Sequence, residues 1–308
     1  MRTTKIAVVG ATGLVGEMML KVLQERCIDA EYFLFASEAH AGEKVIVNGE
    51  EYVLESLTVS RVKEIKADFA LFAAGGDVAR EWASRFVNAG TTVIDNSSYF
   101  RLQPEVPLVV PEINLASIGQ SKLIANPNCS TIGAVVALSP LERVYKIKRI
   151  VYATYQAISG AGRNPHFKYP ITNNVLPDID VLLPDGNTKE EAKMIYETRK
   201  ILGREDLAIS ATAARVPVAN CHCVAINVEF YQQPDLKRVK EILSQAPGVV
   251  YCEDYAVPTF VSGHDEVYVG RVRLDSSQPN TINLWTVSDN LRKGAATNAV
   301  QILESLLA

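Results

Sequence analysis

The fold of this chain is decided by the stretch Ile6-Ala7-Val8-Val9-Gly10-Ala11-Thr12-Gly13-Leu14-Val15-Gly16. Residues 6–9 are a short apolar run typical of a buried strand, and residues 14–24 carry apolar side chains at helical spacing. Between them, Gly10 permits a tight turn, Gly13 lets the backbone approach a pyrophosphate, and Gly16 allows the helix to pack closely on the strand. The start of the helix offers backbone N–H groups to an anion. We therefore predict that residues 10–16 bind a dinucleotide.

Strands and helices alternate through the first part of the chain. Further β-branched or aromatic runs occur at residues 32–35, 69–73 and 92–94, and residues 77–89 have the pattern of a crossover helix. Such alternation predicts a parallel sheet covered by helices on both faces. The fold class is therefore α/β, with a Rossmann-type doubly wound sheet in residues 1–128.

The character of the chain changes after about residue 130. Longer β-rich runs, with fewer helices between them, lie at residues 150–157, 207–213, 224–230, 266–274 and 281–287. This pattern predicts a second, α+β domain built on a mixed or antiparallel sheet, residues 129–289. Residues 188–202 form a strong helical pattern, which Thr188 can cap. Residues 290–308 are again helical, and we expect them to return to the first domain.

The bulk composition excludes several classes of protein. The 308 residues include 31 basic and 35 acidic side chains, so nothing indicates a nucleic-acid or membrane-surface partner. No apolar run approaches the roughly 20 residues that span a bilayer. The apolar core of the first ten residues is too short for a signal peptide and is better explained as a strand. Five irregularly spaced cysteines indicate a cytoplasmic enzyme with mostly structural thiols.

Cys129 is the candidate reactive thiol. It lies in Asn126-Pro127-Asn128-Cys129-Ser130-Thr131, where the proline and asparagines favour a turn and the following apolar run indicates a helix. Unpaired backbone N–H groups at such a junction favour a thiolate and can hold a developing oxyanion. The position predicts a nucleophile directed at a carbonyl group.

The choice between NAD and NADP is open at this level. After the second predicted strand, Ser37 can bond a ribose 2′-phosphate, whereas Glu38 would repel one if it pointed inward. No arginine is near in the sequence, and His40 is a weak substitute that is more simply explained as a solvated loop histidine.

Several motifs in family order carry a more specific resemblance. Besides Gly10–Gly16 they are Asp95-Asn96-Ser97-Ser98-Tyr99-Phe100-Arg101, Val110-Pro111-Glu112-Ile113-Asn114, Asn126–Thr131, Tyr155-Gln156-Ala157-Ile158-Ser159-Gly160-Ala161-Gly162, Lys189-Glu190-Glu191-Ala192-Lys193, Arg215-Val216-Pro217-Val218 with His222, Val269-Gly270-Arg271, and Asp289-Asn290-Leu291-Arg292-Lys293-Gly294-Ala295-Ala296. On these motifs the chain resembles the aspartate-β-semialdehyde dehydrogenases along almost its whole length.

The resemblance implies an NADP-dependent oxidoreductase. Its reaction is the reversible reductive dephosphorylation of L-aspartyl 4-phosphate to L-aspartate 4-semialdehyde through a cysteine thioester, on the route to lysine, methionine and threonine. The implied domains are residues 1–128 plus 290–308, which bind the dinucleotide, and residues 129–289, which carry catalysis and dimerisation. The expected partners are the small-molecule substrates, with phosphate, and further copies of the chain in a homodimer or homotetramer.

The same resemblance assigns roles to single residues. Cys129 is the nucleophile, His222 the acid/base, and Gln156 helps to orient the thiol and substrate. Arg215 binds the α-carboxylate through a bidentate fork, which favours arginine over lysine. Glu190 meets the α-ammonium group. The implied phosphate-binding set is Arg101, Lys193, Asn128 and Ser98.

Some of these residues also have a simpler explanation. Glu190 and Lys193 are spaced as an exposed salt bridge on one helix, and Arg101 is by default a surface arginine. Near the nicotinamide, the candidates are Ala74, Gly75, Ser159, Gly160 and Asn290. The simpler explanation of Asn290 is a helix N-cap.

Two departures and two alternatives remain. Ala39-His40 replaces the arginine-serine pair of many members, and residues 163–170 lack the expected glycine-containing run, so the fold there can differ locally.

Cys221 and Cys223 flank His222, but strand alternation turns them to the opposite face, so we expect no metal site. The alternatives are an N-acetylglutamyl-phosphate reductase and a non-catalytic dinucleotide-sensing relative. Glycine usually replaces Asn128 in the former, and the latter would be expected to lack Cys129 or His222.

Overall fold

The computed structural model describes residues 3–307, so Met1, Arg2 and Ala308 lie outside the described residues. The chain forms two compact units. Unit 1 comprises Met1–Pro111, Leu115–Pro127 and Ala295–Ala308, and unit 2 comprises Glu112–Asn114 and Asn128–Gly294. The functional domains proposed from the sequence, 1–128 with 290–308 and 129–289, remain a prediction.

Unit 1 is built on a six-stranded parallel sheet in the order β5-β2-β1-β6-β7-β8. Its strands are β1 (Thr4–Val9), β2 (Ala30–Ala36), β5 (Glu55–Ser56), β6 (Phe69–Phe72), β7 (Thr92–Asp95) and β8 (Leu123–Ala125). The order reverses direction beside β1, as a doubly wound sheet requires. The predicted Rossmann-type fold is confirmed.

Alternating side chains of the strands serve two helical layers. Ile6 and Val8 of β1 share a buried cluster with α1 (Leu14–Glu25) and α9 (Thr297–Leu307). Phe35 and Phe72, from β2 and β6, instead meet Phe86 of α3 (Gly76–Asn88) edge to face, with ring centroids 6.2 and 5.4 Å apart. Smaller elements complete the unit: η1 (Glu38–His40), the hairpin β3 (Lys44–Val47) and β4 (Glu50–Val53), α2 (Val59–Ile65), and η2 (Leu115–Ile118).

Of the C-terminal segment, residues 295–308 belong to unit 1, whereas residues 290–294 belong to unit 2, and its helix begins irregularly. A π-helical turn, η4 (Arg292–Ala296), precedes α9. π-helical turns are rare and occur frequently at functional sites.

Unit 2 is built on a mixed sheet in the order β10-β9-β11-β14-β13-β12. The strands are β9 (Ile147–Gln156), β10 (Ala208–Arg215), β11 (His222–Phe230), β12 (Val249–Tyr251), β13 (Val267–Leu274) and β14 (Thr281–Ser288). β9 pairs in parallel with β10 and antiparallel with β11. The prediction of a mixed sheet is confirmed.

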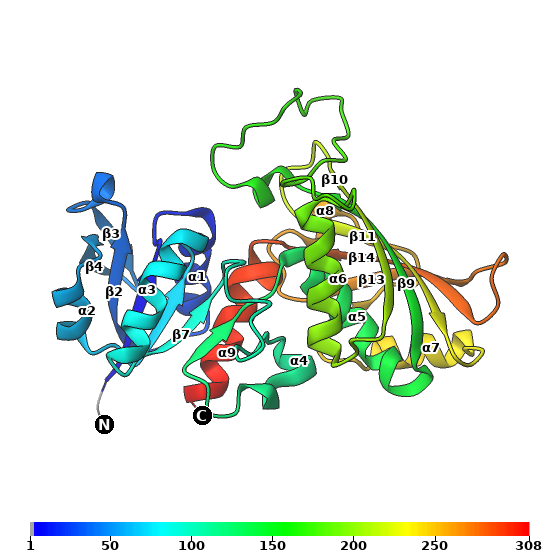
Figure 1. The fold of residues 1–308 in the computed structure, drawn as a ribbon, viewed down its shortest axis with the longest axis horizontal. Helices are drawn as coiled ribbons and strands as arrows, with labels where there is room; N and C mark the ends of the chain where they lie inside the picture. The colour runs from blue at the N-terminus through cyan, green and yellow to red at the C-terminus, as the bar shows by residue number, and fades with distance from the viewer. Residues whose placement is uncertain (1–2, 308) are drawn as a thin grey trace. The chain divides into compact units, whose positions relative to one another are not determined.

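Three helices cover one face of this sheet: α5 (Cys129–Tyr145), α6 (Lys189–Leu202) and α7 (Leu236–Ser244) (Figure 1). Thr188 caps α6 and shares a capping box with Glu191, as its sequence indicated. The fold is completed by three short elements: α4 (Pro111–Asn114), of which Glu112–Asn114 belong to unit 2, and η3 (Ile158–Ala161) and α8 (Pro258–Val261) of unit 2.

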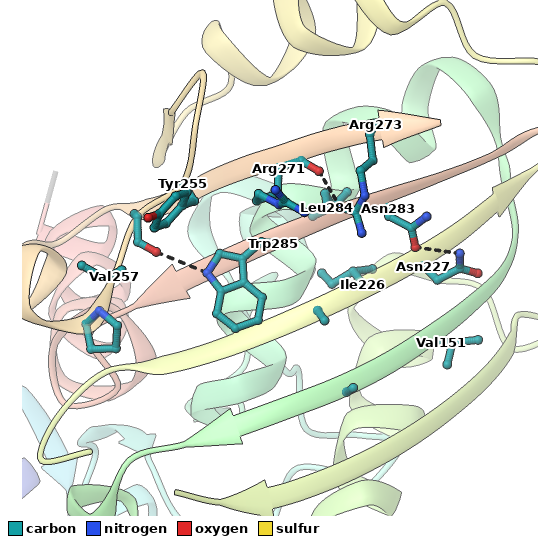
Figure 2. A pocket seen from close by; sticks show the side chains of 14 residues that line it. Val151, Ile226, Asn227, Tyr255, Val257, Arg271, Arg273, Asn283, Leu284 and Trp285 are labelled. Carbon is teal, nitrogen blue, oxygen red and sulfur yellow. Dashed lines mark hydrogen bonds between the residues drawn. The ribbon is translucent and has the colours of Figure 1, made fainter. Parts of the chain in front are cut away.

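The other face of the unit 2 sheet is open. Val151, Ala153, Ala225 and Trp285 lie on it and line a hollow of about 580 Å³ (Figure 2). Trp285 donates its indole N–H to the Ala256 carbonyl, 3.3 Å away, which fixes the ring against the segment before α8. An apolar sheet face of this kind is typical of an interface.

A long connection, residues 163–187, joins η3 to α6 without regular helices or strands. It is tied to the sheet where Leu176 and Arg215 exchange two backbone hydrogen bonds of 2.9 and 2.8 Å. The sequence departure after Gly162 thus coincides with an extended loop, and His166 lies within it.

Candidate active site

The Cys129 thiol lies in the first turn of α5, as the turn-to-helix pattern predicted. Asn128 is the N-cap, and its side-chain oxygen accepts hydrogen bonds from the N–H groups of Ser130 and Thr131, at 3.0 and 3.2 Å. Our expectation that unpaired amides of this turn hold an oxyanion is therefore wrong for these two groups, because the asparagine already occupies them.

Three further predicted residues come from the ends of adjacent strands. Arg215 of β10 pairs with Gln156 of β9 in the parallel register, and His222 begins the neighbouring β11. Since β11 runs antiparallel to β9, its start lies beside the end of β9. Strand alternation directs these three side chains to the face that α5 covers. All three are at least nine-tenths buried.

His222 is a neutral imidazole with a defined proton position. Its Nδ1 accepts a hydrogen bond of 3.0 Å from the Ala157 backbone N–H, so the proton resides on Nε2. Burial, reinforced by the positive charge of Arg215, lowers the pKa of His222 to about 3. Nε2 is buried and has no hydrogen-bond partner among residues 3–307. The imidazole therefore presents one N–H donor to whatever occupies the site.

Glu190, near the start of α6, connects several predicted residues. One carboxylate oxygen accepts from the amide nitrogens of Asn128 and Gln156, at 2.9 and 3.1 Å, and the other accepts from Lys193 at 3.0 Å. Burial opposes its ionisation, but Lys193 and the two amides outweigh burial and lower the pKa of Glu190 to about 2. The simpler explanation, an exposed salt bridge, is wrong because Glu190 is only 5% exposed.

Arg215 supplies a buried guanidinium. One nitrogen donates to the Ala157 carbonyl at 2.8 Å. Burial lowers its pKa, while the Cys129 thiol and Glu190 oppose that shift. Arg215 remains a cation within electrostatic reach of both the thiol and Glu190.

Gly160 leaves space that the site needs. A Cβ atom at this position would lie 2.7 Å from an Arg215 guanidinium nitrogen and 2.9 Å from the His222 ring. The neighbouring Ser159 hydroxyl contacts Asn290, and the Asn290 oxygen accepts the Cys221 N–H at 2.9 Å. The N-cap explanation of Asn290 is wrong, because Asp289 accepts from the amides of the following turn.

Three residues escaped the sequence reasoning. Glu197 is buried and accepts the Asn128 N–H at 2.6 Å. It lies two helical turns after Glu190, a spacing that could have indicated it. Asp180 contacts Lys193 at 2.9 Å, and Gly294 packs its backbone against Cys129, where a Cβ atom would approach to 2.9 Å. No sequence signal pointed to Asp180, and Gly294 stands in a motif of the resemblance that gave it no role of its own.

The predicted dinucleotide loop of unit 1 has the expected geometry. Gly10 has φ +88°, and a Cβ atom on Gly16 would lie 2.0 Å from the Gly10 carbonyl oxygen. No side chain caps the first turn of α1, whose N-cap is Gly13. The end of β6 is followed by Ala74 and by Gly75, whose φ of +86° starts α3. Glycine turns and an uncapped helix start fit a pyrophosphate.

The other predicted residues of unit 1 have clear positions. Ser37 and Ser98 are exposed. His40 pairs with Glu43 at 3.0 Å, which fits the solvated loop histidine. Arg101 is buried, not a surface arginine, and donates to the Asn96 carbonyl at 2.8 Å.

Within residues 3–307, no group of three or more His, Cys, Asp or Glu side chains could hold a metal ion. Cys221 and Cys223 belong to a buried apolar cluster with Val287, on the sheet side opposite to His222.

Comparisons with known proteins decide the family. The semialdehyde dehydrogenase NAD binding domain matches residues 5–121, and the semialdehyde dehydrogenase dimerisation domain matches residues 138–293. Aspartate-semialdehyde dehydrogenase of Aquifex aeolicus is 44% identical, over 98% of both chains. The chain belongs to the aspartate-semialdehyde dehydrogenase family.

Solved structures of the aspartate-semialdehyde dehydrogenase family agree with this assignment. Aspartate semialdehyde dehydrogenase II of Vibrio cholerae, complexed with ASA, has a TM-score of 0.94 at 40% identity, covering 100% of this chain and 99% of that one. The Candida albicans enzyme with NADP has a TM-score of 0.83 at 27% identity, covering 100% and 99%. Membership makes the chain an oxidoreductase with an NAD(P)-binding unit. No helix within residues 3–307 is long and apolar enough to cross a membrane.

Proposed function

We propose that this protein catalyses the reversible reductive dephosphorylation of L-aspartyl 4-phosphate to L-aspartate 4-semialdehyde, with NADPH as reductant. One observation carries the proposal: a cysteine at a helix start shares one buried site with a neutral histidine, an arginine and a glutamate. These are the groups that covalent acyl transfer on a small amino acid needs. Because the family is shown, the reaction class follows from it.

The thiol divides the reaction into two easier steps. The sulfur of Cys129 adds to the acyl-phosphate carbonyl, and the tetrahedral adduct expels phosphate, leaving a thioester. The nicotinamide, when bound, supplies the hydride that reduces a thioester to a hemithioacetal. Collapse of the hemithioacetal breaks the C–S bond, restores the thiolate and releases the aldehyde. Gln156 and Asn128, both hydrogen-bonded to Glu190, hold the surroundings of the thiol rigid.

His222 acts through Nε2 alone, because the Ala157 N–H occupies Nδ1. In the neutral imidazole, Nε2–H donates a hydrogen bond to the oxygen on which negative charge develops in each tetrahedral adduct. Donors of this kind, fixed before the reaction, stabilise the transition state without reorganisation. In this proposal His222 is a hydrogen-bond donor through Nε2–H, in place of the acid/base role expected from the sequence.

The substrate offers groups that match the charges of the site. Arg215 has further donors beyond the one given to Ala157, and these suit the α-carboxylate. Glu190 accepts three hydrogen bonds, and a carboxylate offers about four acceptor positions, so it retains capacity for the α-ammonium group. Lys193, Asn128, Arg101 and Ser98 are the phosphate-binding groups that the family resemblance implies.

For the dinucleotide we propose NADP. Residues 10–16, with Ala74 and Gly75, would pass along the pyrophosphate and nicotinamide, and Ser159, Gly160 and Asn290 would contact the nicotinamide end. The exposed Ser37, whose hydroxyl caps no helix, is the group offered to a 2′-phosphate. The Candida albicans relative, solved with NADP, supports the choice.

We also propose that the chain works as a homodimer in the cytoplasm. The open sheet face around Ala225 and Trp285 is an apolar surface within the segment that matches a dimerisation domain. All five cysteines are free thiols, which suits a reducing compartment.

The decisive experiment measures phosphate-dependent reduction of NADP⁺ by aspartate semialdehyde. Cys129→Ala should abolish turnover while leaving NADPH binding unchanged, because the thiol is in unit 2 and the dinucleotide loop in unit 1. Cys252→Ala, which removes another free thiol of unit 2, is the matched control and should retain activity. Substantial turnover by Cys129→Ala would refute the covalent step.

A further inference from the structure

Lys193 is bound by two carboxylates that belong to different parts of unit 2. Glu190, one turn earlier on α6, lies 3.0 Å from the ammonium nitrogen, and Asp180, on the connection of residues 163–187, lies 2.9 Å from it. Burial pulls the Lys193 pKa down, but Glu190 and Asp180 together raise it above its usual value. One cation therefore serves two anions before any substrate is present.

The two carboxylates differ in how many contacts they make besides the one with Lys193. Glu190 is buried and also holds Asn128 and Gln156, so releasing it from Lys193 would disturb the whole site. Asp180 is more exposed, and within residues 3–307 its other oxygen accepts a hydrogen bond only from the adjacent Val181 N–H, at 2.9 Å. Breaking the contact between Asp180 and Lys193 therefore disturbs no other side chain of the site. Asp180 is the replaceable partner.

The backbone conformation and the hydrogen bonds on either side of Asp180 fix its position. Its φ of +71° is a left-handed conformation that aspartate tolerates better than most residues. On one side, Leu176 is hydrogen-bonded to the backbone of Arg215, and on the other, the Val181 carbonyl accepts the Lys189 N–H at 2.8 Å. The segment that carries Asp180 is thus anchored to Arg215, a proposed substrate-binding residue, and to Lys189, which precedes the proposed substrate-binding residue Glu190.

We propose that Asp180 sets the phosphate affinity of the site: it holds Lys193 in the absence of phosphate and is displaced when phosphate binds. This inference rests on the proposed function, in which Lys193 is a phosphate-binding group. Phosphate at neutral pH carries one to two negative charges, and two carboxylates on one ammonium leave that corner of the site net negative. A phosphate oxygen that replaces Asp180 accepts from the ammonium group at the same hydrogen-bonding position, so phosphate and Asp180 compete for Lys193. The phosphate affinity of the site is therefore set below what Lys193 alone would give.

The test compares two isosteric variants of the same connection. Asp180→Asn removes the competing charge, and Asp178→Asn removes an exposed charge two residues earlier. We expect Asp180→Asn to lower the KM for inorganic phosphate about two- to fivefold, the range of a partly exposed ion pair. The KM for aspartate semialdehyde should stay unchanged, and Asp178→Asn should change neither. A general structural role of Asp180 would move both constants together.

A binding measurement separates this inference from the proposed reaction. Calorimetric titration with inorganic phosphate requires no turnover, so it reports on Asp180 whether or not the enzyme reduces NADP⁺. Asp180→Asn should bind phosphate more tightly than the wild-type protein by the same factor. In a Lys193→Met background, Asp180→Asn should lose its effect, because the ammonium group for which the carboxylate competes is gone. A phosphate affinity that Asp180→Asn leaves unchanged or weakens would overturn the proposal.

Discussion

The backbone N–H of Ala157 donates to Nδ1 of His222 across 3.0 Å and thereby decides what the imidazole can do. Protonating the ring would place two N–H groups against each other inside a buried site. Burial and the charge of Arg215 oppose protonation as well, and the pKa of His222 falls to about 3. The imidazole therefore enters each catalytic cycle neutral, with its single proton on Nε2.

This arrangement predicts a dependence of stability on pH. The unfolded chain takes up a proton at His222 near pH 6.5, whereas the folded chain does so only near pH 3. The contribution of His222 to the free energy of unfolding is fully present above pH 6.5 and is lost progressively as the pH falls from 6.5 to 3. Between pH 7.5 and 5, the free energy of unfolding of unit 2 should fall by about 2 kcal/mol through this group alone.

His222→Asn should remove that part of the dependence. Urea unfolding, followed by Trp285 fluorescence in a Trp82→Phe background, reports on unit 2 at each pH. Carboxylates titrate equally in both proteins, so the difference between the two curves isolates the histidine. Parallel curves for the two proteins would show that His222 has an ordinary pKa and that the fixed tautomer is wrong.

Gly160 gives a second prediction, because its missing side chain makes room for Arg215 and His222. Gly160→Ala would bring a methyl group to 2.7 Å from the guanidinium and 2.9 Å from the ring. Displacing the two groups should lower kcat/KM about 100-fold, since a misplacement of about 1 Å costs this much. Steady-state kinetics and thermal unfolding are the measurements. Loss of activity with an unchanged unfolding midpoint would show that Gly160 positions Arg215 and His222 for the reaction. A normal kcat/KM would show that the reaction does not depend on the positions of these two side chains.

Local physical rules account for most of the fold and for the position of the nucleophile. Glycines at Gly10 and Gly16 are needed because the backbone folds so tightly there, and Thr188 with Glu191 starts α6 through contacts three residues apart. Cys129 lies where the turn-to-helix pattern placed it. These features depend on residues that are close together in the sequence, so they can be predicted from it.

The features that escaped prediction depend on segments far apart in the chain. Asn128 was expected in the site, but its side chain turned out to cap α5 while its backbone is held by Glu197 of α6. Asp180 reaches Lys193 only because an irregular connection folds back on the start of α6. No periodicity or capping rule sets the path of such a connection, so the contact could not be read from local pattern.

The cofactor prediction concerns Ser37. We expect a higher kcat/KM with NADP⁺ than with NAD⁺, and Ser37→Ala should reduce this preference about three- to tenfold, the effect of one exposed hydrogen bond to a charged group. Glu38→Gln is the complementary variant. It removes a negative charge beside the expected 2′-phosphate and should increase the preference. Equal or better turnover of NAD⁺ by the wild-type enzyme would contradict the proposed choice of NADP.

The open sheet face gives the last prediction. Ala225 lies at its centre, paired with Ala153 of β9 and Trp285 of β14. In a two-fold interface the same patch is contributed by both copies, so one substitution acts twice. Ala225→Arg would bury two unpaired cations of like charge, at a cost of several kcal/mol, and should shift the protein to monomers at micromolar concentration. Gln245→Arg, an equal charge change at the exposed end of α7, is the control. Light scattering coupled to size-exclusion chromatography distinguishes the outcomes: a wild-type dimer and a monomeric Ala225→Arg variant place the second copy on this face, and a dimer that tolerates Ala225→Arg places it elsewhere.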